Sequence, residues 1–342
     1  MSADMTDPAD DAPDRAPEGA LPLLPDDPDD DSPPIDPLAV IAAISEPGQA
    51  LPFAQLHALS IVTDDLARRW LAVWPTLPVE RRRELLAAFQ RLSADDATLD
   101  FSRPHLIAVL DPDAATRMLG IRGLWEYERE EYLLLLLDRV RSDPDPAVRV
   151  VAAEALGQFV LTMEFDLLTE EIAERLSETL RDVVGDVTEE DEVRAAALVA
   201  IGASSEEWVA ELITEMYSVP AAALRVAALC AMGRNAADEW LPILIYNFED
   251  EDPDVRAAAA TAAGQLLLED AVEPLAALTA DDEREVRKAA IAALGEIAGD
   301  AAETVLVGLS RDHDAETAAL ATNALREARL IGIDFNSPSE DV

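Results

Sequence analysis

Residues 219–298 constrain the fold most strongly, because nearly the same short sequence recurs there three times. The three copies read LRVAALCAMG, VRAAAATAAG and VRKAAIAALG. Each copy carries an arginine at its second position, which we call the anchor, and these anchors are equally spaced along the chain: Arg225, Arg256 and Arg287. A fixed period of roughly 20 to 50 residues is typical of a solenoid, in which each unit packs only on its neighbours. The sequence therefore predicts a repeat architecture.

The same pattern extends to both sides of this segment. Arg194 lies one period before Arg225, and Ala318 occupies the anchor position of a degenerate last copy. Upstream, Arg117 and Arg149 are separated by almost the same spacing. The distance from Arg149 to Arg194 is longer, at roughly one and a half periods, so a segment is inserted between these two copies.

Each copy has the pattern of a helix with a closely packed face. The positions three and six after the anchor are always Ala or Gly, and small residues on one face let a neighbouring helix approach closely. A second helix precedes each anchor, and several connecting turns carry an Asp-Pro pair, in which the carboxylate is expected to cap the next helix. These pairs are Asp111-Pro112, Asp143-Pro144 and Asp252-Pro253. A glycine after the packed face is expected to end or bend the helix, and it occurs as Gly157, Gly202, Gly233, Gly264 and Gly295.

The pattern D-x-D-x-x-V-R-x-x-A-x-x-A-L-G resembles the HEAT repeat, in particular the short variety first noted in the bilin lyases of phycobilisomes. The resemblance covers roughly residues 100–330 and implies an all-α fold, a right-handed α-α superhelix of HEAT-like units. In that family the Asp of the turn and the Arg of the second helix form a ladder from unit to unit. The ladder Asp lies six positions before the anchor in four copies: Asp111, Asp143, Asp250 and Asp281. Thr188 and Val219 interrupt the ladder, and the last copy has Asp312 without an anchor Arg.

Four segments are expected from composition and pattern. Residues 1–35 are acidic and rich in proline, with too few apolar residues to fold, and are predicted to be a disordered leader. Residues 36–110 are predicted to form degenerate helical repeats that cap the N-terminal end of the stack. Residues 111–330 form the HEAT-like array, and residues 331–342 are expected to be a frayed tail. Within the array, residues 159–170 belong to the insertion and are too apolar for a solvated loop, so we expect an extra helical turn there; a partner-binding element is the alternative.

The charge of the chain limits its partners. There are 70 acidic and 26 basic residues, a net charge of −44, and this field repels nucleic acid and acidic membranes. The basic run of Arg81, Arg82 and Arg83 is expected to pair with neighbouring carboxylates, with a phosphate or acidic-peptide site as the alternative. The N-terminus has no signal-peptide pattern and no stretch approaches roughly 18 consecutive apolar residues, so no membrane association is expected. The single cysteine, Cys230, suits a reducing compartment, and we expect a cytoplasmic protein.

The sequence offers no motif for catalysis, cofactor binding or metal binding. The three histidines, His57, His105 and His313, are scattered along the chain, and a metal site needs converging ligands. No phosphate loop, dinucleotide fingerprint or serine-nucleophile motif occurs. The expected protein is therefore not an enzyme and carries no cofactor.

A binding surface is expected on the concave side of the stack, which the anchor helices line. The positions one and five after the anchor face away from the buried stripe. The expected partner-binding residues are Met118, Arg122, Val150, Glu154, Val199, Val226, Cys230, Thr261, Lys288 and Asn323. The alternative is that these residues are small only because curvature crowds them.

The predicted function is a non-enzymatic scaffold that binds a protein or peptide partner along the concave face. The alternative is an accessory or lyase-type protein, similar to bilin lyases, that presents a partner subunit or a tetrapyrrole for modification.

Overall fold

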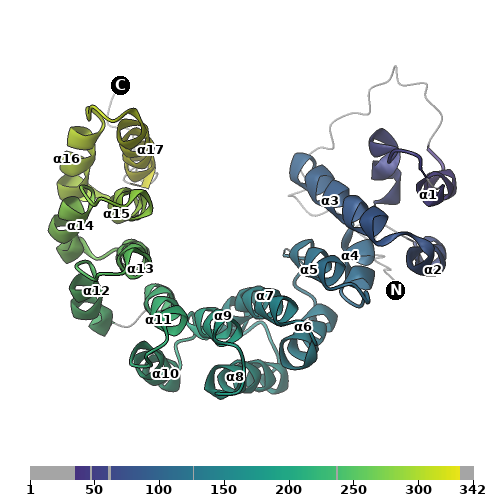
Figure 1. Ribbon diagram of the computed structural model, residues 1–342, viewed down its shortest axis with the longest axis horizontal. Helices are drawn as coiled ribbons and strands as arrows, with labels where there is room; N and C mark the ends of the chain where they lie inside the picture. Colours follow the sequence, from purple (N-terminus) through teal and green to yellow (C-terminus); the bar gives the residue numbers. More distant parts are fainter. Residues whose placement is uncertain (1–34, 47, 61–62, 126, 236–237, 332–342) are drawn as a thin grey trace, which may run out of the picture.

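The computed structural model describes residues 35–46, 48–60, 63–125, 127–235 and 238–331, and these residues form a curved, all-α solenoid (Figure 1). Except for Ile35 and Ile331, the expected leader and the expected tail lie outside the described residues. Paired helices follow one another along the arc, and the two ends of the solenoid face each other across an open concave side. The predicted solenoid is confirmed.

The N-terminal part is helical, as expected. Its elements are α1 (Pro37–Ser45), η1 (Phe53–Leu59), α2 (Asp64–Val73), η2 (Trp74–Thr76), α3 (Val79–Asp95) and α4 (Ser102–Ala108). Their buried side chains, which include Trp70, Leu85 and Phe89, form a hydrophobic core of their own. A larger core begins at Val109 and continues through the repeats to Ala324.

The array alternates inner helices, which carry the anchors and line the concave side, with outer helices on the convex side (Figure 1). The inner helices are α5 (Ala114–Arg122), α7 (Pro146–Glu164), α9 (Asp191–Ile201), α11 (Ala222–Arg234), α13 (Pro253–Gln265), α15 (Arg284–Ile297) and α17 (Ala315–Ile331). The outer helices are α6 (Glu130–Ser142), α8 (Glu170–Gly185), α10 (Glu207–Tyr217), α12 (Leu241–Asn247), α14 (Val272–Leu278) and α16 (Gly299–Leu309). The short helices η3 (Asp238–Trp240) and η4 (Glu269–Ala271) precede α12 and α14.

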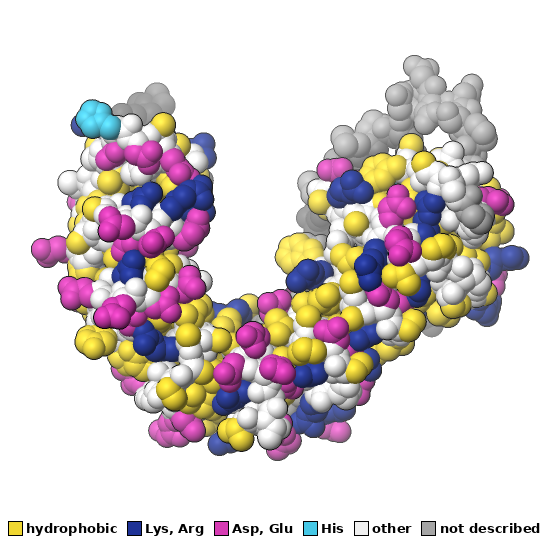
Figure 2. Space-filling model, viewed as in Figure 1, with side chains coloured by type: hydrophobic (Ala, Val, Ile, Leu, Met, Phe, Trp, Pro, Cys, Tyr) yellow, Lys and Arg dark blue, Asp and Glu magenta, His cyan; other side chains and the backbone are white. Residues whose placement is uncertain are grey.

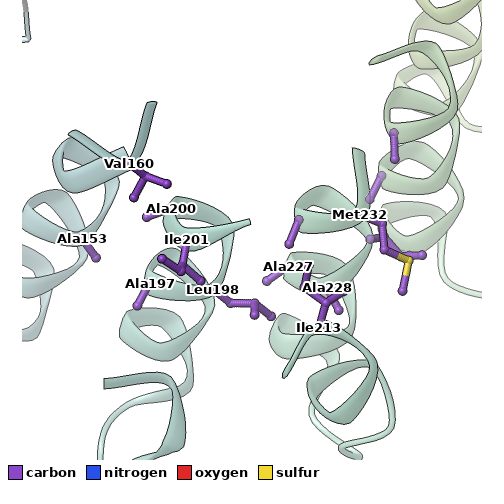
Figure 3. Packing of buried hydrophobic residues seen from close by; sticks show 14 of the residues in the cluster. Ala153, Val160, Ala197, Leu198, Ala200, Ile201, Ile213, Ala227, Ala228 and Met232 are labelled. Carbon is purple, nitrogen blue, oxygen red and sulfur yellow. The ribbon is translucent and has the colours of Figure 1, made fainter. Parts of the chain in front are cut away.

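The small residues of the packed face hold neighbouring units together. Ala197 and Ala228, each three positions after an anchor, are fully buried, and Figure 3 shows them among the larger side chains of the core. Inner helix packs on inner helix along this face, as the spacing of alanines predicts.

The glycines after the packed face act differently from what the sequence suggests. Gly157, Gly233, Gly264 and Gly295 lie inside their helices rather than ending them, and Gly202 is a C-cap in the right-handed region. From α9 onward each of these glycines touches the backbone of an alanine in the next inner helix. A Cβ at Gly233 would lie 2.7 Å from the Cα of Ala262, and one at Gly264 would lie 2.7 Å from the Cα of Ala293. Glycine is needed at these positions because neighbouring inner helices approach each other closely, and not because the backbone turns there.

Replacing Gly264 with Ala is therefore expected to destabilise the protein by about 1–3 kcal/mol, because the clash is with a backbone atom that cannot move aside. Gly308, inside α16, is the matched control, since a Cβ there meets nothing within 4 Å. Gly308→Ala should raise stability by up to about 1 kcal/mol, as alanine favours the helix. Urea denaturation of both variants checks the prediction, and a Gly264→Ala protein as stable as the parent would contradict the packing described.

The ladder of Arg and Asp runs between units. The Arg117 guanidinium donates to the Asp143 carboxylate of the following unit at 2.6 and 2.8 Å, and to the backbone carbonyl of Asp111 in its own turn at 2.9 Å. Arg256 repeats this arrangement with Asp281 and with the carbonyl of Asp250. Each of these anchors thus fastens its own turn to the next unit.

The structure also shows what replaces the missing ladder residues. Where Thr188 stands in the ladder position, the adjacent Glu189 accepts from Arg149 at 2.7 Å. Where Val219 stands, Arg194 turns back to Asp191 of its own helix at 3.0 Å. Arg225 continues the ladder by pairing with Asp250.

Two of the expected capping residues have another role. Asp252 caps α13, as predicted. Asp111 and Asp143, however, are buried ladder residues, and the helices that follow them are capped two positions later by Asp113 and Asp145. The backbone N–H of each cap residue donates to the ladder carboxylate, at 2.9 Å in Asp113 and 3.0 Å in Asp145.

The basic run in α3 extends the ladder into the N-terminal part. Arg82 pairs with Asp111, which also accepts from the indole N–H of Trp74 at 2.7 Å. Arg83 makes two bonds to Asp113, at 2.6 and 2.9 Å, and these bonds hold the pKa of that carboxyl below its ordinary value. The prediction that these arginines pair with carboxylates is confirmed, and α3 takes the place of an inner helix before α5.

Candidate functional site

A cavity opens on the concave side at the middle of the array. It has a volume of about 760 Å³ and is lined by four consecutive inner helices, α7, α9, α11 and α13. Figure 2 shows the hollow outline of the concave side, with acidic side chains gathered on the limb that carries α12 to α16. The cavity lies between the limbs, where the inner helices are covered by no other described element.

Half of the expected partner-binding residues meet in this cavity. Val150 and Glu154 come from α7, Val199 from α9, and Val226 and Cys230 from α11. Because they occupy equivalent positions on three successive helices, the repeat brings together residues that are far apart in the sequence.

The other expected residues lie on inner helices but outside the cavity. Met118 and Arg122 are on α5, Thr261 on α13, Lys288 on α15 and Asn323 on α17. Three of them have local partners. The Lys288 ammonium donates to Glu285 at 3.0 Å, the Thr261 hydroxyl donates to the carbonyl of Ala257 at 3.0 Å, and Asn323 accepts from Arg326 at 3.3 Å.

The charged rim of the cavity was not among the residues predicted from the sequence. Glu192, Asp252 and Asp254 line it from the helix N-termini, and Arg234 lines it from the C-terminal end of α11. The repeat periodicity could have identified Arg234. One helical turn beyond the positions one and five after the anchor lie the positions three before and nine after it, and in α11 these are Ala222 and Arg234.

The cavity therefore combines an apolar floor with an acidic edge. The floor consists of valine and alanine side chains and the Cys230 thiol, and the edge carries the carboxylates of Glu154, Glu192, Asp252 and Asp254 against the single cation of Arg234. Burial raises the pKa of Cys230 and lowers the pKa of Arg234, which lies one turn away on the same helix. The thiol is thus neutral at pH 7, and we find no activated nucleophile in the cavity.

Among the described residues, no group of three or more His, Cys, Asp or Glu side chains is arranged to hold a metal ion. His105 is buried against Phe89 and directly beneath Gly123, where a Cβ would collide with the imidazole ring. Burial lowers the pKa of His105 to about 4, so the ring is neutral at pH 7. The small residue at position 123, expected from the repeat pattern, makes room for this ring.

One helix, α7, is long and apolar enough to cross a membrane by length and composition. It packs in the array against α5, α6, α8 and α9, and Val151, Leu156 and Val160 belong to the common core. Its buried apolar residues are accounted for by these contacts.

A sequence model of HEAT repeats matches residues 103–185, 209–285 and 237–326, which together make up more than half of the chain. No curated protein sequence matches the chain. Three solved structures are similar to the chain at low identity. The complex of CpcE and CpcF of phycocyanin lyase from Nostoc sp. PCC7120 has a TM-score of 0.48 at 17% identity, over 90% of this chain and 100% of that one. The YibA protein of Escherichia coli has a TM-score of 0.43 at 18% identity, over 71% of this chain and 96% of that one. Human deoxyhypusine hydroxylase has a TM-score of 0.35 at 19% identity, over 86% of this chain and 96% of that one.

These likenesses concern the fold alone, whereas the sequence model covers the repeats themselves. The chain belongs to the HEAT repeat family.

Proposed function

We propose that this protein is a non-enzymatic scaffold whose concave cavity binds a segment of a protein partner. The observation that carries the proposal is the cavity itself, where an uncovered apolar floor lies at the centre of an otherwise strongly acidic protein. Pockets that bind ligands are typically apolar with a few charged groups at defined places. The proposed setting is the cytoplasm, where the Cys230 thiol stays reduced.

The charges at the edge indicate the chemistry of the segment. Four carboxylates and one guanidinium give the cavity a net negative charge, and the net charge of −44 adds to this field. A segment with one or two large apolar side chains, flanked by Lys or Arg, satisfies both the floor and the edge. An acidic segment would be repelled.

The same charges disfavour the second candidate, the presentation of a tetrapyrrole. The volume of the cavity is within the range of small-molecule sites. A bilin or porphyrin, however, carries two propionate groups, and one partly buried arginine among four carboxylates would not compensate them.

The single cysteine allows a direct test of occupancy. The probe is a synthetic peptide with a central Phe-Leu pair flanked on each side by two Lys or Arg residues. Bound in the cavity, it should cover Cys230 and slow maleimide labelling of the thiol at pH 8.5 by roughly fivefold or more at saturation. A peptide in which Glu replaces every Lys and Arg is the control and should leave the labelling rate unchanged. A basic peptide that binds without protecting Cys230 would show that the segment lies elsewhere.

Charge variants test the edge of the cavity separately. The triple change Glu154→Gln, Glu192→Gln and Asp254→Asn should weaken binding of the basic peptide roughly tenfold at low salt, because attraction at the edge is removed. A matched triple, Glu249→Gln and Glu251→Gln in the turn after α12 and Glu273→Gln in α14, removes the same charge at residues that do not line the cavity. Equal losses in both triples would mean that the peptide responds to net charge only.

A further inference from the structure

The turn between α7 and α8 exposes a group of large apolar side chains. Leu161, Phe165 and Leu167 lie close together in sequence and are 45%, 73% and 72% exposed. Leu161 and Phe165 are one helical turn apart at the C-terminal end of α7, so they share a face. We call these three residues the α7–α8 patch. It belongs to the insertion, and its purpose is not explained by the concave cavity.

The insertion divides into a structural half and an exposed half. Phe159 and Val160 are buried in the core, which confirms the expected extra helical turn for this half. After Glu164 the chain makes a tight helix stop in which Asp166 has a positive φ of 55° and the Leu167 N–H donates to the Thr162 carbonyl at 3.1 Å. In such a stop the residue at the position of Leu167 ordinarily packs back on the helix. Here its side chain is largely exposed to solvent instead.

The patch is placed by the extra length of α7. This helix has 19 residues, whereas α11 and α13 have 13 each. The turn belongs to the edge of the solenoid where inner helices lead into outer helices, and the Arg-Asp ladder belongs to the opposite edge. None of the three patch residues lines the concave cavity, so the cavity and the patch are separate surfaces.

A groove at the same turn supplies the complementary charge: Glu164, Asp166 and Leu168, which alternate in sequence with Phe165 and Leu167, line it. It has a volume of about 890 Å³ and runs from the end of α7 along α8 to Trp208 at the start of α10. Its walls carry six carboxylates: Glu164, Asp166, Glu170, Glu174, Glu178 and Glu206. None of the six forms an ion pair with another described residue, and the one cation in the groove, Arg181, lies over the Trp208 ring at 4.9 Å. Met163, Leu168 and Trp208 give the groove an apolar component.

We infer that the α7–α8 patch and this groove form a second docking surface, which takes a basic amphipathic helix of a partner protein. The apolar face of such a helix would cover Phe165 and Leu167, and its Lys and Arg residues would lie against the carboxylates of the groove. A second copy of this chain is disfavoured as the occupant, because two surfaces that each carry unpaired carboxylates on proteins of charge −44 repel one another. The scaffold would then hold one partner segment in the cavity and another at this edge.

The probe for this surface is a fluorescein-labelled helical peptide of about 18 residues with Leu and Trp on one face and Lys and Arg on the other, measured by fluorescence anisotropy. The measurements use the full chain carrying Val226→Arg. This change places a cation in the concave cavity, so that a basic peptide no longer binds there and only binding at the second surface is measured. We expect Phe165→Ser with Leu167→Ser to weaken binding at least tenfold. Both side chains are largely exposed, so circular dichroism and the melting temperature should remain those of the Val226→Arg parent.

Two further variants separate the patch from general charge attraction. Glu170→Gln, Glu174→Gln and Glu178→Gln should also weaken binding at least tenfold, and should flatten its dependence on salt. The same control triple, Glu249, Glu251 and Glu273 to Gln, and the exposed apolar pair Tyr246→Ser with Leu330→Ser should change the affinity less than twofold.

Three outcomes would overturn the inference. The first is an affinity that Phe165→Ser with Leu167→Ser leaves unchanged. The second is an equal loss in the two glutamate triples, which would indicate attraction by net charge. The third is a dimer in sedimentation that the patch variant converts to monomer, which would make the patch a contact between copies of this chain. None of these outcomes bears on the concave cavity, because that site is tested by protection of Cys230.

Discussion

Replacing Ala228 with Asp is expected to destabilise the protein by at least about 4 kcal/mol, which is a large part of the stability of an ordinary domain. Ala228 is three positions after the anchor Arg225 and is fully buried in the common core. A carboxylate there would have neither water nor a partner charge, and the neighbouring units leave no room for its extra atoms. We expect this variant to be unfolded or partly folded at physiological temperature, as measured by circular dichroism and urea denaturation.

The same substitution at Val226, two positions away, is the matched comparison. Val226 is half-buried and lines the concave cavity, so a carboxylate placed there reaches solvent. The expected cost is about 1 kcal/mol, from the partial loss of apolar burial. If both variants unfold alike, the Val226 side of α11 is as tightly covered as the Ala228 side, and the concave cavity does not exist in solution. A stable Ala228→Asp protein would contradict the stacking of the inner helices.

Removing one carboxylate from the ladder is the second change with a large expected effect. Asp143→Asn leaves the Arg117 guanidinium, 7% exposed, without the carboxylate to which it donates two bonds. The loss of one partner from a buried ion pair costs about 3–5 kcal/mol, because the remaining charge stays out of water. The cost should appear as a lower midpoint in urea denaturation.

An exposed ion pair provides the control for this experiment. Arg68 and Asp65 also form an ion pair, but their side chains are 72% and 90% exposed. Asp65→Asn should therefore change the stability by less than about 1 kcal/mol. If the two variants were equally stable, the ladder would be no more than a row of surface ion pairs.

The period of the sequence was sufficient to predict the architecture, because every unit carries the same pattern of small and apolar positions and therefore packs in the same way. Alanines three and six positions after the anchor define a narrow helix face, and only close helix packing uses such a face. Ala197, Ala228 and Ala259 are all fully buried, as this reasoning requires. The positions one and five after the anchor lie away from this buried face, so they were expected on the concave side. Val199 and Val226, at these positions, line the cavity.

The glycines and the ladder show where reasoning from one helix fails. Gly264 looks like a helix stop in sequence, but its lack of a Cβ is needed by Ala293 of the next unit. Asp143 precedes a proline and looks like a cap, but its carboxylate is used by Arg117 of the preceding unit. Both roles depend on the separation between units, and a pattern within one unit carries no information about that distance.

By itself, the sequence determined the helices, their order and the face that each one buries, since hydrophobic periodicity and turn residues act over short stretches of the chain. Only the tertiary structure decided which side chains meet. The stacking of units brought Glu154, Val199, Cys230 and Asp252 to one cavity, and it left Phe165 and Leu167 uncovered at the end of a lengthened helix. The physical reason is that curvature and the offset between successive units set the distances across the concave face, and these quantities arise from the sum of many small contacts between helices.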